Sequence, residues 1–330
     1  LSEAARGEGG ILRHKDGERF MERYAPSIKD LAPRDMVSRA IATEISAGNG
    51  AGPDSDYVYL DLTHLGAETI KKKLPDITDF VRTYVKIEPI EEPIPVQPTA
   101  HYAMGGIPTD VHSRVLSDEK GTVLPGVYAA GEAACVSVHG ANRLGTNSLL
   151  DIVVFGKRAG QSMVDYVTQT KPNTISDSAS DDLSKKIQNL IDKEHTDEFS
   201  VANIRKDLQE SMEENAKIFR TKETLEKQTE ILEELRERYE NVTIFDKSKV
   251  HNSELVEAIE LDYLLDMSEA TVASALARNE SRGAHSRQDF PDRDDTNFMK
   301  HSFAFKKDNS ANLKYKDVEL GKYEPMERKY

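Results

Sequence analysis

Four short segments of the chain combine arginine, histidine or glutamate side chains with nearby glycines. They are residues 3–10, 32–35, 97–107 and 131–150. An arginine offers a planar fork that grips a carboxylate through two parallel hydrogen bonds, so these segments could hold a small organic acid. Each one alone has an ordinary explanation: Arg34 could be a surface charge, and His101 could form hydrogen bonds within a loop. Their chemistry becomes specific only when the four are taken together.

The fourth segment has the clearest physical signal. Residues 127–130 predict a buried strand that ends in Gly131-Glu132, which places a carboxylate where a sugar or ribityl chain can be held. A helix predicted to begin at Asn147 and Ser148, with these two residues as its cap, points free N–H groups and a positive dipole end at a ligand. Such an N-terminus suits the negative charge of a reduced flavin.

In this order and at these separations, the four segments resemble the succinate dehydrogenase/fumarate reductase flavoprotein family, most closely its succinate dehydrogenases. The similarity runs from Glu3 to residues 323–330. The resemblance implies an FAD enzyme that oxidises succinate to fumarate and passes electrons to an iron–sulfur subunit and then to quinone. It also implies an α/β fold, with an α+β capping domain and a Rossmann-like FAD-binding domain, followed by an α-helical bundle and a C-terminal extension.

The same resemblance implies the catalytic residues. Arg34 matches the residue that moves a proton at one methylene carbon while the neighbouring carbon exchanges a hydride with flavin N5. Glu3 and Arg6 match the relay that links Arg34 to solvent. Arginine is ordinarily never deprotonated, but fumarate reduction requires Arg34 only to donate a proton, and the reverse reaction must follow the same path.

Binding residues follow from the resemblance in the same way. His101 and Arg143 match the pair that binds the substrate carboxylates, and Ser2 stands where the family often has a threonine that touches substrate. The expected FAD contacts are Glu132, Tyr102, Asn147, Ser148 and Leu149. The resemblance assigns no metal ion to this chain.

Two parts that an FAD-binding fold of this family requires do not occur in the sequence. There is no Gly-x-Gly-x-x-Gly turn to cradle the pyrophosphate. The family's flavin-linking histidine precedes the Glu-x-x-Arg-Gly motif, and therefore precedes Leu1. We interpret the chain as the C-terminal part of a longer polypeptide, in which FAD is attached through a histidine outside this segment.

The domains expected from the resemblance are residues 1–96 for the cap, 97–170 for the returning FAD-binding segment, 171–283 for the helical domain and 284–330 for the C-terminal, partner-facing extension. Local patterns add detail. Residues 9–21 predict a hairpin about Asp16-Gly17, and Pro33 predicts the start of a helix. The prolines between 87 and 98 predict an extended connector.

Beyond a polar linker at residues 170–182, the pattern predicts a small helix bundle. Apolar stripes are expected at Leu225, Leu232, Leu235 and Tyr239, and at Leu255, Ile259, Tyr263 and Met267. A later motif, residues 280–285 with Arg287 and Asp289, favours a salt-bridged structural turn over direct chemistry. The tail after Gly283 shows little periodicity.

Bulk composition limits the other functions. A net charge of −14 excludes a general nucleic-acid binder. The single cysteine, Cys135, excludes a disulfide framework. The longest apolar run, 149–155, is too short to span a bilayer, so we expect anchor subunits to hold the protein peripherally. The expected location is the cytoplasmic face of a bacterial inner membrane or the mitochondrial matrix face.

Three alternatives remain. L-aspartate oxidase shares the Pro-Arg-Asp motif, but it usually has Cys-Gly-Gly where this chain has Met104-Gly105-Gly106, and residues 107–109 favour the succinate/fumarate branch. Fumarate reductase would run the same chemistry in reverse, although residues 135–139 favour succinate dehydrogenase. A non-catalytic interaction fragment built on the acidic helices is the third, and the four segments argue against it.

Overall fold

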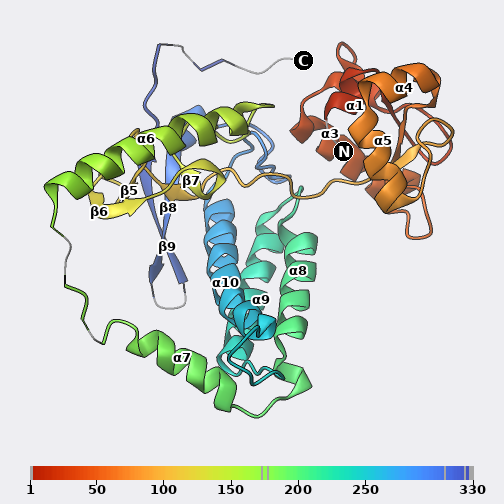
Figure 1. The fold of residues 1–330 in the computed structure, drawn as a ribbon. Helices are drawn as coiled ribbons and strands as arrows, with labels where there is room; N and C mark the ends of the chain where they lie inside the picture. The colour runs from red at the N-terminus through yellow and green to blue at the C-terminus, as the bar shows by residue number, and fades with distance from the viewer. Residues whose placement is uncertain (1–2, 172–173, 177, 308–309, 323–324, 327–330) are drawn as a thin grey trace. The chain divides into compact units, whose positions relative to one another are not determined.

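The structure is a computed structural model, and it describes residues 3–171, 174–176, 178–307, 310–322 and 325–326 (Figure 1). Ser2, one of the predicted substrate-binding residues, lies outside the described residues. The chain divides into two compact units, the first formed mainly by the residues up to His101 and the second by Tyr102–Glu319. Among the described residues, no helix is both long enough and apolar enough to cross a membrane.

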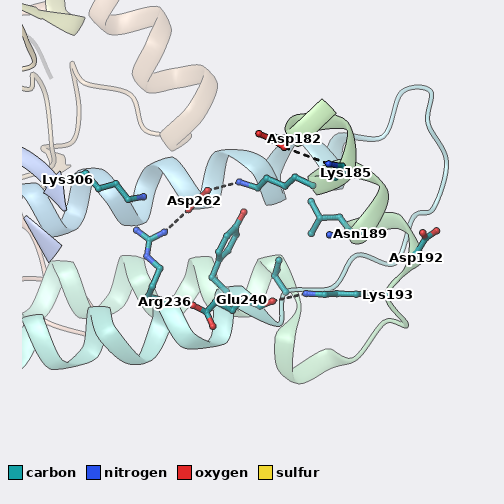
Figure 2. A pocket seen from close by; sticks show the side chains of 13 residues that line it. Asp182, Lys185, Asn189, Asp192, Lys193, Arg236, Glu240, Asp262 and Lys306 are labelled. Carbon is teal, nitrogen blue, oxygen red and sulfur yellow. Dashed lines mark hydrogen bonds and ion pairs between the residues drawn. The ribbon is translucent and has the colours of Figure 1, made fainter. Parts of the chain in front are cut away.

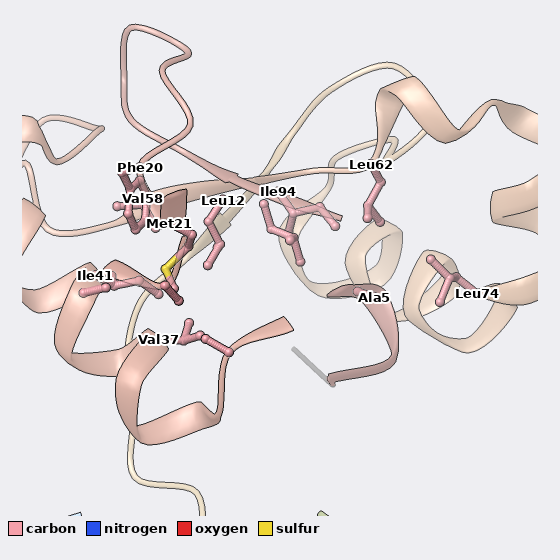
Figure 3. Packing of buried hydrophobic residues seen from close by; sticks show 14 of the residues in the cluster. Ala5, Leu12, Phe20, Met21, Val37, Ile41, Val58, Leu62, Leu74 and Ile94 are labelled. Carbon is pink, nitrogen blue, oxygen red and sulfur yellow. The ribbon is translucent and has the colours of Figure 1, made fainter. Parts of the chain in front are cut away.

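The first unit packs short helices on a three-stranded antiparallel sheet. Its strands are β1 (Ile11–Arg13), β2 (Val58–Asp61) and β3 (Ile94–Val96), in the order β1-β2-β3. Its α-helices are α1 (Glu3–Gly7), α2 (Met21–Tyr24), α3 (Arg34–Glu44), α4 (Ala67–Lys73) and α5 (Pro75–Phe80). Figure 3 shows the core between sheet and helices, where Leu12 and Val58 of the sheet meet Val37 and Ile41 of α3. This core holds the first turn of α3 near α1.

One local expectation for this unit needs correction, and a second holds in part. The turn about Asp16-Gly17 forms, but only a single bridge joins Arg13 to Arg19, and β1 pairs with β2 instead. Phe20 and Met21 are fully buried at the start of α2, because their apolar area is better removed from water in the core than in an exposed hairpin. The proline-rich connector contains β3, where Pro95 is tolerated because β3 is an edge strand.

The second unit begins with two small two-stranded sheets and one long helix. β4 (Ile107–Pro108) pairs in parallel with β7 (Ala134–Cys135), and β5 (Arg114–Leu116) pairs antiparallel with β6 (Val123–Tyr128). The prediction of a buried strand at 127–130 is wrong in its burial, since Val127 is 45% exposed. Helix α6 (Asn147–Gln169) starts where expected, but its N-cap is Thr146 in a left-handed conformation, without a side-chain cap.

The rest of the second unit is a helix bundle with a C-terminal hairpin. Its helices are α7 (Asp181–Asp192), α8 (Val201–Ala216), α9 (Lys222–Glu240), α10 (Ser253–Ala277) and α11 (Asp295–Phe298), and its strands are β8 (Lys300–Lys307) and β9 (Ser310–Asp317). Figure 1 shows α8, α9 and α10 side by side, with α7 leading into them. Thr221 caps α9 in a capping box with Thr224, and Asn252 caps α10 by accepting from the Leu255 amide.

The apolar stripe predicted on α9 is buried as expected, but the one on α10 is not. Tyr263 and Met267 are 57% and 61% exposed, whereas Leu261 and Leu265 are fully buried. Residues spaced by four drift about 40° around a helix at each step, because the helix turns 100° per residue. A stripe that begins partly buried at Leu255 therefore ends on the outer face. The β8–β9 hairpin was also missed in the tail, where Phe303 and Phe305 share one face of β8 and Ser302, Ala304 and Lys306 the other.

Candidate functional site

The N-terminal turns of α1 and α3 bring the three predicted catalytic residues of the first unit together. Pro33 precedes α3 with an extended backbone, so the helix begins at Arg34 and its side chain leaves the first turn. Arg34 Nε donates to Glu3 Oε2 at 3.3 Å. Arg6 is 9% exposed, and its Nη1 donates to the carbonyl of Ala32 at 2.8 Å and to that of Asp30.

Arg6 shares its surroundings with a second guanidinium. Burial lowers the pKa of Arg6, the carboxylate of Glu3 raises it, and the positive charge of Arg34 lowers it further. Glu3 thus stands close to both arginines and stabilises their charge. The Glu3–Arg6–Arg34 group predicted from the sequence is a contiguous polar cluster in the structure, with Glu3 half-exposed and Arg6 buried.

Arg34 and His101 line the same hollow within the first unit. Its volume is ≈ 600 Å³, and its lining comes from the starts of α1 and α3, from the α4–α5 corner and from His101. The complete lining is Ala4, Arg34, Lys73, Leu74, Pro75, Asp76, Ile77, Phe80 and His101. Two cations and an imidazole face one carboxylate, Asp76, so the hollow favours a small anion that also has an apolar carbon chain.

Arg143 in the second unit is held over an aromatic ring. Its guanidinium carbon lies 4.4 Å from the centroid of the Tyr102 ring, and Nη1 donates to the Leu144 carbonyl at 3.0 Å. Arg143 Nε is buried and has no hydrogen-bond partner among the described residues. A buried donor without a partner costs free energy, so an oxygen that accepted from this nitrogen would stabilise the arrangement.

Two residues without an assigned role support this arrangement. His139 Nε2 lies 3.0 Å from Asp151 Oδ2, and Tyr102 Oη lies 3.3 Å from the same nitrogen. Since a carboxylate only accepts, Nε2 carries a proton, and Nδ1 is buried without a partner among the described residues. Burial and the nearby Asp151 carboxylate raise the pKa of Tyr102.

The role of Asp151 could have been found in the sequence. It interrupts the apolar run 149–155, and a carboxylate in such a run is usually buried only when it is paired. It is 4% exposed in the first turns of α6, facing His139. Nothing in the sequence named its partner, which depends on the loop folding back over the helix.

The predicted FAD contacts all lie in the second unit. Glu132 is in the short 3₁₀ turn after β6, and its Oε1 accepts from the Ala103 amide at 2.8 Å, next to Tyr102. Asn147, Ser148 and Leu149 form the first turn of α6, and Leu149 is 59% exposed. The contact of these five residues with a flavin stays a prediction, as does the convergence of Arg143 with Arg34 and His101.

A larger hollow of ≈ 750 Å³ lies elsewhere, among α7, α9, α10 and β8 (Figure 2). Its cations already have partners. Lys186 Nζ lies 2.6 Å from Asp262, and Arg236 binds Asp262, Asp266 and Glu269 at 2.6–2.9 Å. These ion pairs hold α7 and α9 against α10, and Lys306 of β8 pairs with Asp266 at 2.6 Å, so we assign this hollow a structural role.

A group with metal-ligand chemistry lies at the turn of the first unit. His14, Asp16 and Glu18 have ligand atoms within 4.8 Å of one another. Arg23 already bonds Glu18 and also donates to Glu44 at 2.7 Å, and Glu44 lies 2.8 Å from His14. A guanidinium therefore supplies the positive charge that these carboxylates need, and we assign no metal to them.

Comparison with known proteins identifies the family. Residues 1–149 match the family described as FAD binding domain, and residues 205–330 match the one described as fumarate reductase flavoprotein C-term. The succinate dehydrogenase flavoprotein subunit of Rickettsia bellii is 47% identical over 92% of this chain and 51% of its own length. The chain belongs to the succinate dehydrogenase/fumarate reductase flavoprotein family.

Other members of this family give the same result. The mitochondrial succinate dehydrogenase [ubiquinone] flavoprotein subunit of Oryza sativa is 46% identical over 97% of this chain and 51% of its own length. A solved structure of E. coli quinol fumarate reductase has a TM-score of 0.89 and 38% identity, covering 99% of this chain and 57% of that chain. The chain thus spans about half the length of the curated relatives it matches. The mixed helix-and-sheet architecture agrees with the predicted fold class at this level.

Proposed function

We propose that this chain supplies the proton-transfer and carboxylate-binding residues of an FAD enzyme that interconverts succinate and fumarate. The observation that carries the proposal is the hollow shared by Arg34 and His101, with Glu3 and Arg6 directly behind Arg34. A scaffold protein has no need for a buried arginine placed behind a second, ligand-facing one. The succinate dehydrogenase and fumarate reductase names of the relatives supply the substrate class.

Substrate is oriented by its two carboxylates. His101 and Arg143 bind the carboxylates, and the bidentate fork of Arg143 fixes the plane of the group that it holds. Tyr102 restrains this fork from one side through the contact at 4.4 Å. The apolar lining residues Leu74, Ile77 and Phe80 accommodate the methylene carbons and reduce access of water.

Proton transfer belongs to Arg34. In fumarate reduction Arg34 gives a proton to one carbon, and the Glu3–Arg6 cluster, with Glu3 3.3 Å away, returns a proton to it from solvent. In succinate oxidation the same cluster first removes a proton from Arg34, and the neutral side chain then takes the proton from one methylene carbon. Placing the transferring group within reach of the carbon avoids the entropy cost of recruiting an external base.

FAD fits the residues that the second unit presents. It would accept the hydride from the second methylene carbon when bound. Arg143 Nε and His139 Nδ1 are buried polar atoms without partners among the described residues, and both lie in the segment before α6. Glu132, Tyr102 and the first turn of α6 (Asn147, Ser148, Leu149) would hold the cofactor, with the helix dipole facing its anionic edge.

The remaining parts of the proposal concern the assembly. Electrons would leave through an iron–sulfur subunit toward quinone, with anchor subunits holding the complex at a membrane surface. The covalent flavin link would use a histidine outside this segment. For direction, residues 135–139 and the C-terminal segment favour succinate oxidation as the physiological reaction.

The proposal is tested on the intact complex. Succinate added without oxygen should bleach the flavin absorption band, and malonate should prevent the bleaching. Arg34→Ala should reduce turnover at least about a thousandfold while malonate still perturbs the flavin spectrum, because a general acid–base is lost and the binding residues remain.

Arg39→Ala is the matched control, since it removes the same side chain from the same helix one and a half turns on. It should leave turnover near that of the unmodified enzyme. Unchanged succinate oxidation by Arg34→Ala would remove Arg34 from the mechanism, and an unmodified complex that does not bleach would refute the substrate assignment.

A further inference from the structure

The turn at residues 280–285 touches the loop that precedes α6. The Ala284 amide donates to the Ala141 carbonyl at 3.0 Å. Gly283 has φ of +60°, and a Cβ built on it would lie 2.5 Å from the Ala141 oxygen and 2.6 Å from its carbonyl carbon. Only a glycine allows this approach, for steric and for backbone reasons. Along the chain, Ala141 is two residues from Arg143 and two residues from His139.

This turn is rigid because buried ion pairs hold it from within. Glu280 is fully buried and accepts from Arg282 Nε at 2.8 Å and from Arg282 Nη2 at 2.9 Å. Arg278 donates to the same carboxylate at 2.7 Å, and the Asp294 amide does so at 2.9 Å. Every strong acceptor position of Glu280 is thus occupied, which leaves the turn one arrangement.

The turn is also fixed to the helix bundle. Arg287 is 1% exposed and caps the end of α10 by donating to the Ala275 and Leu276 carbonyls, both at 3.1 Å. His285 Nε2 lies 3.2 Å from the Arg278 carbonyl, and its Nδ1 lies 3.0 Å from Arg220 Nη1, just before α9. Burial lowers the pKa of His285 to about 4, so it stays neutral and accepts from Arg220.

We propose that the 280–285 turn is a positioning element for Arg143, in which Gly283 and Ala284 set the place of the Ala141 peptide and thereby the aim of the Arg143 fork at a substrate carboxylate. This inference rests on the proposed function. It assigns the helix bundle a part in substrate affinity, through a backbone contact rather than through a side chain that touches substrate. Gly283 and Ala284 are positioning residues and not catalytic ones.

Gly283→Ala is the direct test in the flavin-loaded complex. A Cβ at 2.5 Å from a backbone oxygen forces the Ala141 peptide to move, and misplacement by about 1 Å at such a distance can cost about a hundredfold. We expect KM for succinate and Kd for malonate, read from the flavin spectrum, to rise between about tenfold and a hundredfold. The turnover number should fall by a smaller factor, because Arg34 is not part of this contact.

Gly121→Ala is the matched control. Gly121 also has a positive φ, of +89°, and a Cβ on it would meet no atom within 4 Å. It carries the backbone strain of the substitution without the clash, so KM and Kd should stay within about twofold of the unmodified enzyme. An equal rise in both variants would mean general destabilisation and would overturn the proposal.

Glu280→Gln provides a second route if the alanine variant does not fold. It loosens the turn without adding atoms, because a neutral amide pairs less strongly with Arg282 and Arg278. We expect a threefold or larger rise in Kd for malonate and faster hydrogen exchange in peptides that cover residues 139–146. Unchanged Kd and unchanged exchange in this variant would overturn the proposal. Failure of the proposed function itself would appear in the unmodified complex, as absence of bleaching by succinate.

Discussion

Glu44 is the last residue of α3, the helix that begins with Arg34, and its hydrogen bonds stabilise this end of the helix. Replacing Glu44 by glutamine tests how much its charge contributes to that stabilisation. Its side chain is 4% exposed. Its carboxylate lies within hydrogen-bond distance of four groups, Arg23 Nη2 at 2.7 Å, Tyr24 Oη at 2.6 Å, Asn49 Nδ2 at 2.7 Å and His14 Nε2 at 2.8 Å. Glutamine keeps the shape and removes the charge, so the variant isolates the electrostatic contribution.

The expected magnitude follows from the pKa of Glu44. Burial by itself would raise this pKa, but hydrogen bonds from Tyr24, Arg23 and Asn49 outweigh burial and lower it from 4.5 to about 2. At about 1.4 kcal/mol per pKa unit, this difference stabilises the fold by about 3 kcal/mol at pH 7. Because the folded-state pKa is the lower one, the stabilisation is complete above about pH 5 and is lost as the pH falls toward 2, with about 1.4 kcal/mol remaining at pH 3.

The contribution of the Glu44 charge to the free energy of unfolding is measured by urea unfolding at pH 7 and pH 3. Hydrogen exchange in peptides from residues 34–49 reports unfolding of this part of the chain. Glu44→Gln should lose about 3 kcal/mol at pH 7 and less than half of that at pH 3. Glu92→Gln, an exposed glutamate of the same unit, is the control and should lose almost nothing at either pH. A loss from Glu44→Gln that is equal at the two pH values would refute the electrostatic reasoning.

Two further predictions concern the second unit. Arg143→Lys should weaken malonate binding at least about tenfold, because a point charge replaces a two-pronged fork worth about 1.5–3 kcal/mol; an unchanged Kd in a flavin titration would exclude Arg143 from carboxylate binding. Arg236→Ala should destabilise the helix bundle by about 3–5 kcal/mol, since it leaves Asp262, Asp266 and Glu269 without their shared cation. Thermal unfolding followed by circular dichroism checks this, and a melting temperature equal to that of the unmodified protein would contradict it.

Local signals in the sequence determined the family and many of the elements. The four segments were enough to predict the family, and Pro33 marked the start of α3 to within one residue, since it is the N-cap and Arg34 is the first helical residue. The stripe of Leu225, Leu232, Leu235 and Tyr239 marked the buried face of α9. These signals succeed because capping, proline geometry and helical periodicity act within a few residues of one another.

Burial and pairing were harder to predict. The sequence pattern placed Tyr263 and Met267 inside, yet Leu261 and Leu265 occupy the core. Both sets are apolar, so the choice between them depends on which face α8 and α9 leave for α10. The same reason explains why Phe20 and Met21 were assigned to a strand and not to the start of a helix. Either element can bury these two side chains, so their apolar character does not decide between them.

The sequence is therefore sufficient to establish the set of chemical groups, their order along the chain and the family. Two contacts could be found only in the tertiary structure, that of Asp151 with His139 and that of Gly283 with Ala141. Each of these contacts joins segments whose separation along the chain exceeds the reach of periodicity and capping. Their partners are selected by the packing of whole elements, which minimises exposed apolar area and unpaired polar groups over the entire unit at once.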